Sequence, residues 1–304
     1  MFDLLHQLCQ VHAPSGNEVL MKLFLLDYIE QNSYQWKVKP QVVQGVEFQD
    51  ALVLVFGKPR TAIFAHIDSI GFMVRYENEL IPIGGPEAKI GYQLRGRDTK
   101  GEILCSIDQE EDHHITYAFD RNIERGTELT FDCDFRLDEE YVQSCYLDNR
   151  LGVWNALRVA ETLEDGIIAF SCWEEHGGGS VSVIAKYIYE KYGVQQALIS
   201  DITWITKGVH HGKGAAISIR DRSIPRRNFV NTIIQLVAQE NIPYQLEVEA
   251  YGGSDGKDLQ SSPYPFDWCF IGAAEANVHS PDEKVHLADI DSMLKIYQLL
   301  MKKL

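Results

Sequence analysis

The stretch RLGVWNALRVAETLEDGIIAFSCWEE, residues 150–175, decides the fold. Apolar residues recur at helical spacing over 150–165, and an apolar run of strand length follows at 166–173. A helix that leads directly into a buried strand is typical of βαβ units, in which helices cover both faces of a parallel sheet. The run ends at two adjacent carboxylates, Glu174 and Glu175, which repel each other unless a positive group holds them or one stays protonated.

The same alternation of strand and helix patterns continues to the end of the chain. We expect an α/β fold whose mostly parallel sheet is sandwiched by helices. The expected strands are 50–57, 60–68, 166–173, 197–201, 244–250 and 266–273, and the expected helices are 16–32, 150–165, 181–193, 288–304 and one within 223–241. Ser15 and Glu18 match a capping box at the start of the first of these helices.

Residues 69–145 show a different pattern. Short strand-like pieces such as GFMVRY and ELTFDCDF are separated by turns, and no helical periodicity is present. We therefore expect a small all-β domain here, inserted into an α/β domain made of residues 1–68 and 146–304.

The composition narrows the partners and the compartment. A formal net charge of −16 argues against nucleic acid or an anionic membrane as a partner. No apolar run approaches the ~18 residues that a membrane span needs, and the N-terminal residues lack the basic region of a signal peptide. The six cysteines include no C-x-x-C pair, which argues against a structural zinc or a redox motif. We expect a cytoplasmic protein with reduced thiols.

Acids and histidines recur where the expected strands end. The residues at strand ends, together with one at the start of the 150–165 helix, are His66, Asp68, Asp148, Glu174, Glu175, Asp201 and His279. Taken alone, Asp148 also fits a helix N-cap and His66 a hydrogen-bonded core residue. Taken together, they lie where the carboxyl ends of parallel strands converge on one crevice. Histidines and carboxylates in such a crevice suit zinc or a similar divalent ion.

Six segments, in this order along the chain, resemble the motifs of the di-metal aminopeptidases of the glutamyl aminopeptidase and tetrahedral aminopeptidase type. They are AHIDSIGFMV (65–74), LDNRLG (147–152), WEEHG (173–177), SDIT (200–203), HHGKGAAISIRD (210–221) and VHSPDE (278–283). The resemblance implies an α/β peptidase that hydrolyses N-terminal residues from short peptides.

The resemblance also implies a ligand set. One metal ion would be bound by His66, Asp148 and Asp201, and the other by Asp148, Glu175 and His279, so that Asp148 bridges the two. The implied cofactors are two divalent ions, with zinc the first choice and cobalt or manganese as alternatives.

The remaining roles follow from the same resemblance. Glu174 would act as the general base on a water that bridges the metals, and Asp68 would accept a hydrogen bond from His66. The insert 69–145 would carry the contacts of a homo-oligomer and restrict access to the site. The chain departs from the family pattern at Ser69, His176 and Ala276, and these departures bear on the preferred N-terminal residue.

Three other functions stay open. A metal-dependent deacylase or carboxypeptidase related to acetylornithine deacetylase would carry its extra domain between Asp201 and His279, whereas here the insert lies between His66 and Asp148. A glycosidase would need its two carboxylates on opposite sides of a sugar, which adjacent Glu174 and Glu175 do not provide. An inactive binding homologue would keep the fold without the chemistry.

Overall fold

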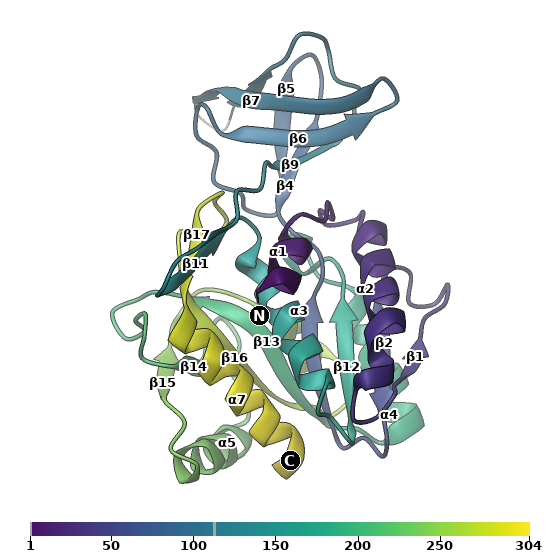
Figure 1. The fold of residues 1–304 in the computed structure, drawn as a ribbon, viewed down its shortest axis with the longest axis vertical. Coiled ribbons are helices and arrows are strands. Elements are labelled where there is room, and N and C mark those ends of the chain that lie inside the picture. The colour runs from purple at the N-terminus through teal and green to yellow at the C-terminus, as the bar shows by residue number, and fades with distance from the viewer. Residues whose placement is uncertain (1, 112–113) are drawn as a thin grey trace.

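The computed structural model describes residues 2–111 and 114–304, which form an α/β body with a small β-barrel above it (Figure 1). The centre of the body is a run of parallel strands in the order β12, β3, β13, β16. These are β12 (Gly166–Ser171), β3 (Thr61–His66), β13 (Gln196–Trp204) and β16 (Asp267–Ala276). They are buried almost throughout, as apolar strands covered on both faces should be.

Antiparallel strands extend the sheet on both sides. They are β1 (Gln41–Val43) and β2 (Leu52–Phe56) beside β12, and β17 (Glu283–His286), β11 (Tyr141–Ser144) and β10 (Arg136–Leu137) beside β16. A branch is formed by β14 (Ala215–Arg220), which is antiparallel to β16, and by β15 (Tyr244–Val248), which is parallel to β14. The predicted α/β fold with a mostly parallel centre is confirmed, although the flanks make the whole sheet mixed.

Helices cover this sheet. They are α1 (Asp3–Cys9), α2 (Val19–Asn32), α3 (Leu147–Ala160), α4 (Ser180–Tyr192), α5 (Arg227–Gln239), α6 (Asp255–Ser261) and α7 (Leu287–Lys303), with short 3₁₀ turns at η1 (Ser33–Gln35) and η2 (Glu174–His176). α3 contacts α1, α7 and the strands β3, β12 and β13, whereas α4 contacts β12 and α6, and α6 also contacts β3 and β16. The side chains of Trp154 and Tyr297 are fully buried between the helices and the sheet. None of the described helices is long and apolar enough to span a bilayer.

The barrel is closed by six strands in the order β4, β5, β8, β7, β6, β9. These are β4 (Gly71–Val74), β5 (Glu79–Ile83), β6 (Gln93–Asp98), β7 (Gly101–Glu111), β8 (His114–Ala118) and β9 (Glu128–Phe131). Phe72, Leu94 and Phe131 lie in its own small core. The expected insert was 69–145, but β10 and β11 pair with the large sheet, so the barrel strands occupy 71–131 alone.

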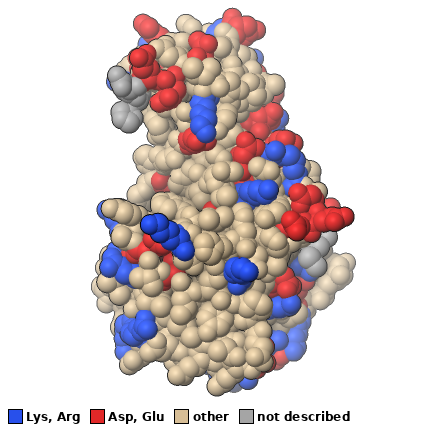
Figure 2. Space-filling model, turned by 90° about the vertical axis from the view of Figure 1, so that its left-hand side faces the viewer, with Lys and Arg blue, Asp and Glu red and all other residues tan. Residues whose placement is uncertain are grey.

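Charge is unevenly spread over the surface. Figure 2 shows acidic side chains gathered on the barrel and beside its junction with the body, while much of the body on this face carries few charges. The excess acidic side chains are therefore not evenly distributed over this face of the molecule.

The predicted capping box is wrong. The N-cap of α2 is Glu18, and no side chain bonds the first turn. The Ser15 hydroxyl instead donates to Asp68 at 2.5 Å, and the Glu18 carboxylate accepts from the backbone N–H groups of Gly16 and Trp173. Both side chains are thus used to join the N-terminal segment to the loops that carry the site. The short helices α1 and α6 were not expected from the sequence.

Candidate metal centre

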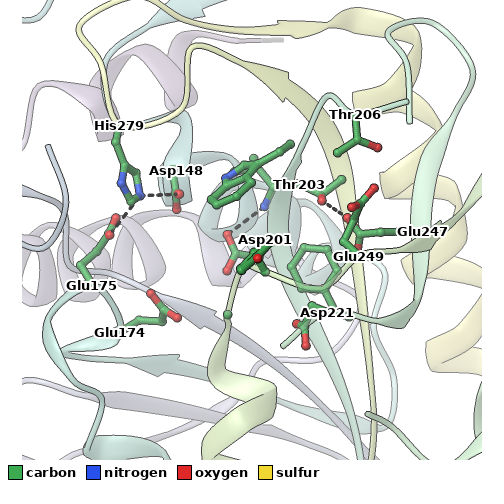
Figure 3. Close-up of a pocket in the computed structure, with 16 residues that line it drawn as sticks. Asp148, Glu174, Glu175, Asp201, Thr203, Thr206, Asp221, Glu247, Glu249 and His279 are labelled. Atoms are coloured by element: carbon green, nitrogen blue, oxygen red, sulfur yellow. Dashed lines mark hydrogen bonds and ion pairs between the residues drawn. The ribbon is translucent and has the colours of Figure 1, made fainter. Parts of the chain in front are cut away.

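The carboxyl edge of the parallel strands brings together all seven side chains singled out by the sequence. His66 ends β3, Asp201 lies in β13, and η2 places Glu174 and Glu175 directly after β12. The remaining three are Asp68 in the loop after β3, Asp148 in the first turn of α3, and His279 in the loop after β16. Figure 3 shows five of these side chains around one cavity.

The first group is buried. His66 Nε2 lies 3.2 Å from Asp148 Oδ1 and 3.7 Å from Asp201 Oδ2. The side chains of His66, Asp148 and Asp201 are 1%, 12% and 7% exposed. This spacing brings the three ligand atoms within 4.8 Å of one another.

The second group shares Asp148 with the first. His279 Nε2 lies 3.3 Å from Asp148 Oδ2 and 3.2 Å from Glu175 Oε2. The two oxygens of Asp148 therefore face different histidines. Each histidine also has a second carboxylate nearby, Asp201 for His66 and Glu175 for His279. A carboxylate in that position can bridge two cations.

Both groups have the dimensions of a metal site. A tetrahedral zinc ion with bonds of about 2.0–2.1 Å keeps its ligand atoms roughly 3.3 Å apart, close to the distances between these donors. One oxygen of Glu175, Oε1, is buried and has no hydrogen-bond partner. Such an orphaned acceptor fits a site that a cation completes.

Negative charge is in excess around the site. Burial, and then the neighbouring carboxylates, raise the pKa of Glu174 well above its usual value, and the same causes act on Asp201. Burial opposes the charge of His279, yet its hydrogen bonds to Asp148 and Glu175 raise its pKa to about 12. Two divalent cations would relieve this crowding of buried carboxylates, since an opposite charge favours the ionised form.

Asp68 contacts both His66 and the turn that carries Glu174 and Glu175. Its Oδ1 lies 3.3 Å from His66 Nδ1, and its two oxygens accept the backbone N–H groups of Glu174 and Glu175, each at 3.1 Å. Arg150, fully buried, donates to the carbonyl oxygens of Ile67 and Asp68. Asp68 thus lies against the ring of His66 and holds the turn that carries both glutamates.

A barrel loop completes the surroundings of His279. The Nδ1 atom of His279 lies 3.0 Å from the carbonyl oxygen of Gly85, and the carbonyl of His279 accepts the N–H of Glu87 at 2.8 Å. The ring of His176, one of the departures from the family pattern, accepts the N–H of Gly84 at 3.0 Å. The departure at His176 therefore joins the barrel loop to η2.

The other two departures do not line the cavity that contains the candidate ligands, although Ala276 lines a neighbouring cavity together with His279. The Ser69 hydroxyl donates to the carbonyl of Ala13, and Ala276 lies in β16 opposite Lys284 of β17.

Sequence reasoning missed two buried glutamates. Glu283 accepts the N–H groups of Asp148 and His279, and so holds these two residues in place. Glu275 is 1% exposed, and neither of its carboxylate oxygens has a partner among the described residues. Glu283 ends the VHSPDE segment, which was the available signal; Glu275 lies inside an apolar strand and gave none.

Fold and site together define a hydrolase of the peptidase class. The chain belongs to the M42 glutamyl aminopeptidase family, whose family model matches residues 105–296. The matched part contains every residue of the two groups except His66. A protein of Acetivibrio thermocellus that carries an aminopeptidase name is 25% identical over 328 residues, covering 97% of each chain.

Solved structures show the same fold. The aminopeptidase APDkam598 from the archaeon Desulfurococcus kamchatkensis is 21% identical, with a TM-score of 0.86 over 100% of this chain and 94% of that one. The Pyrococcus horikoshii TET1 peptidase, described as assembling into a tetrahedron or a large octahedral shell, is also 21% identical, with a TM-score of 0.82 over 100% and 99%.

Proposed function

We propose that this protein is a di-metal aminopeptidase that removes N-terminal residues from short peptides. The observation that carries the proposal is the placement of Asp148, whose two oxygens face His66 and His279 on opposite sides. Membership of the M42 family supplies the class of reaction.

The proposed ligands are the two groups already described. His66, Asp148 and Asp201 would hold one divalent ion, and Asp148, Glu175 and His279 the other. Bound there, the ions would supply Lewis acidity, which polarises a peptide carbonyl and lowers the pKa of water. Zinc fits the mixed nitrogen and oxygen donors, with cobalt and manganese as alternatives.

Glu174 is the proposed general base. Its carboxylate lines the same cavity as the ligands, and it forms no hydrogen bond to another described side chain. Burial raises its pKa, and the bound cations would lower it again, since an opposite charge favours the ionised form that a base needs. Glu174 would take a proton from the attacking water and deliver it to the nitrogen of the leaving amine.

Asp68 is proposed as a positioning residue. It contacts the ring of His66 and the backbone beneath the glutamates, and so acts through them rather than on the substrate. A hydrogen-bonded carboxylate of this kind fixes the ring orientation of a ligating histidine.

We propose that the barrel mediates subunit contacts and restricts access to the site. Exposed apolar side chains on it include Tyr76, Ile81, Ile90 and Leu104. The barrel loop touches His279, and in that position it would narrow the approach to the site and favour short peptides over folded proteins. The assemblies of the TET1 relative support a homo-oligomer, and we place the protein in the cytoplasm because its six cysteines are free thiols.

The test is hydrolysis of leucine p-nitroanilide before and after chelation and return of zinc, cobalt or manganese. We expect activity to disappear with the metal and return with it. N-acetyl-leucine p-nitroanilide is the matched control, because an aminopeptidase needs the free amine. Hydrolysis of N-acetylated amino acids with no release from the free amine would favour the deacylase instead, and inactivity on both would favour the binding homologue.

A further inference from the structure

The cavity that contains the candidate metal centre continues away from it and ends at three further acids. It has a volume of about 260 Å³, and its far wall includes Asp221, Glu247 and Glu249. We call these three residues the acidic subsite. Figure 3 shows them on the opposite side of the cavity from His279 and Glu175.

The residues of the acidic subsite lie in or directly after two neighbouring strands, β14 and β15. Asp221 follows β14 directly, while Glu247 lies within β15 and Glu249 just after it. Because β14 and β15 pair in parallel, with Ser218 opposite Glu247, their ends reach the same side of the cavity.

Two of the three acids of this subsite are buried, Asp221 at 7% and Glu247 at 4% exposed. Their hydrogen-bond donors are neutral: Asp221 accepts the N–H of Ser223, and Glu247 accepts the hydroxyl of Thr203. Arg220 acts on Asp221 by its charge, which lowers the pKa of that acid less than burial raises it, but forms no salt bridge with it among the described residues. Over residues 2–111 and 114–304, no lysine or arginine forms a salt bridge with any of the three acids. Burial accordingly raises the pKa of both buried acids, a shift that a bound cation would reverse.

The distance from the candidate metal ligands to the acidic subsite matches the length of a long side chain. Asp201 and Thr203 are two residues apart in β13, so they project from the same face of the sheet at a spacing of roughly 7 Å. Glu247 accepts a hydrogen bond from Thr203. A long substrate side chain that starts beside Asp201 therefore reaches the acidic subsite.

The walls of the cavity suit the stem of such a side chain. Phe270, 5% exposed, lines the cavity from β16, and the more exposed Trp204 and Tyr251 lie at its rim. Lysine and arginine carry apolar stems that pack on aromatic rings, and their charged ends are attracted to ring faces. The other end of the same cavity is lined by the candidate metal ligands Asp148, Glu175, Asp201 and His279, so a side chain bound here would extend from the metal centre.

We infer that the acidic subsite binds the side chain of the substrate's N-terminal residue and selects lysine or arginine there. This inference rests on the proposed aminopeptidase function, because it places the scissile bond at the metal groups. It runs against the glutamyl preference named in the family description, since an acidic side chain would meet three carboxylates.

The test compares substrates that differ only in the ammonium group. The metal-loaded protein is assayed with the p-nitroanilides of lysine, norleucine and glutamate. We expect kcat/KM for lysine to exceed that for norleucine at least about 10-fold, the scale of hydrogen bonds to charged groups, and glutamate to be the poorest. Free lysine should also inhibit more strongly than free norleucine, which reports binding without turnover.

Two variants assign the preference to the subsite. Asp221→Asn and Glu247→Gln should each lower the lysine-to-norleucine ratio about 10-fold or more, with the remaining norleucine turnover showing that the site is assembled. Glu240→Gln, an exposed change at the end of α5, is the matched control and should leave the ratio as it was. A ratio that stays high in both subsite variants would overturn the assignment.

The two levels of the proposal fail differently. Turnover of norleucine or glutamate at or above the rate for lysine would overturn the inferred preference and leave the aminopeptidase function intact. No turnover of any of the three substrates with any of the three metals would overturn the proposed function and the preference with it.

Discussion

The His66 half and the His279 half of the candidate metal centre are built from different kinds of structure. His66 ends a central strand, is 1% exposed, and lies 3.3 Å from the buried Asp68. His279 lies in a loop, its side chain is 26% exposed, and its ring meets the backbone of the barrel. The His66 half is built from the sheet, the start of α3 and the loop after β3, whereas the His279 half also contacts the inserted segment. We therefore expect the two halves to respond differently to substitution and to chelators.

The largest effect should come from the residue that the halves share. Asp148→Ala removes the oxygens that face both histidines, so both metal ions should be lost and activity should fall to background. Elemental analysis and leucine p-nitroanilide turnover measure the two effects. Retention of a full pair of ions by this variant would show that Asp148 does not bridge.

A smaller but still large effect should separate the adjacent glutamates. Glu174→Gln should keep both ions and lower kcat about 10²–10⁴-fold, because a proton acceptor is removed while the shape is preserved. Glu175→Gln should lose the ion of the His279 half and keep that of the His66 half. Equal metal contents in the two variants would refute this division of roles.

Asp68→Asn should act on the His66 half at intermediate strength. Replacement of a carboxylate that orients a ligating histidine typically costs 10–100-fold in metal affinity or activity. The amide keeps the size of the side chain, so added zinc should restore much of the activity. A loss of affinity confined to the other ion would contradict the contact between Asp68 and His66.

The smallest effect is expected at the barrel contact. His176→Ala removes the acceptor of the Gly84 N–H and should loosen the loop beside His279, with a loss of a few-fold in metal affinity at that half, the scale of one neutral hydrogen bond. During chelator titration the wild-type protein should release the more exposed His279 ion first, and the variant earlier still. Release of the His66 ion first in both proteins would invert the comparison.

The sequence anticipated the His66 side of the fold better than its surroundings. Apolar runs of fixed length mark central strands, and residues that directly follow them reach one edge of the sheet, so the position of Asp201 needs no tertiary information. The helix α6 follows two glycines and has no apolar periodicity, so the sequence pattern did not predict a helix there. Ser15 and Glu18 looked like a cap because a pattern of spacing cannot show that other loops compete for the same side chains.

The acidic subsite was missed for a related reason. Glu247 alternates with apolar residues in YQLEV, which reads as the solvent face of an edge strand. Only the pairing of β14 with β15 turns that face toward the cavity. Asp221 ends the segment 210–221 that resembles a family motif, and it lies between Arg220 and Arg222 in the sequence, a pattern typical of a charge-balanced surface turn.

The contact between the barrel and His279 is made by main-chain atoms, the carbonyl of Gly85 and the N–H of Glu87. Side-chain replacement in this loop leaves such atoms in place, whereas an insertion or deletion moves them. The loop is therefore tolerant of changes in residue identity and intolerant of changes in length. Sequence changes in the barrel can therefore alter the outer surface of the molecule without disturbing the histidine that this loop contacts.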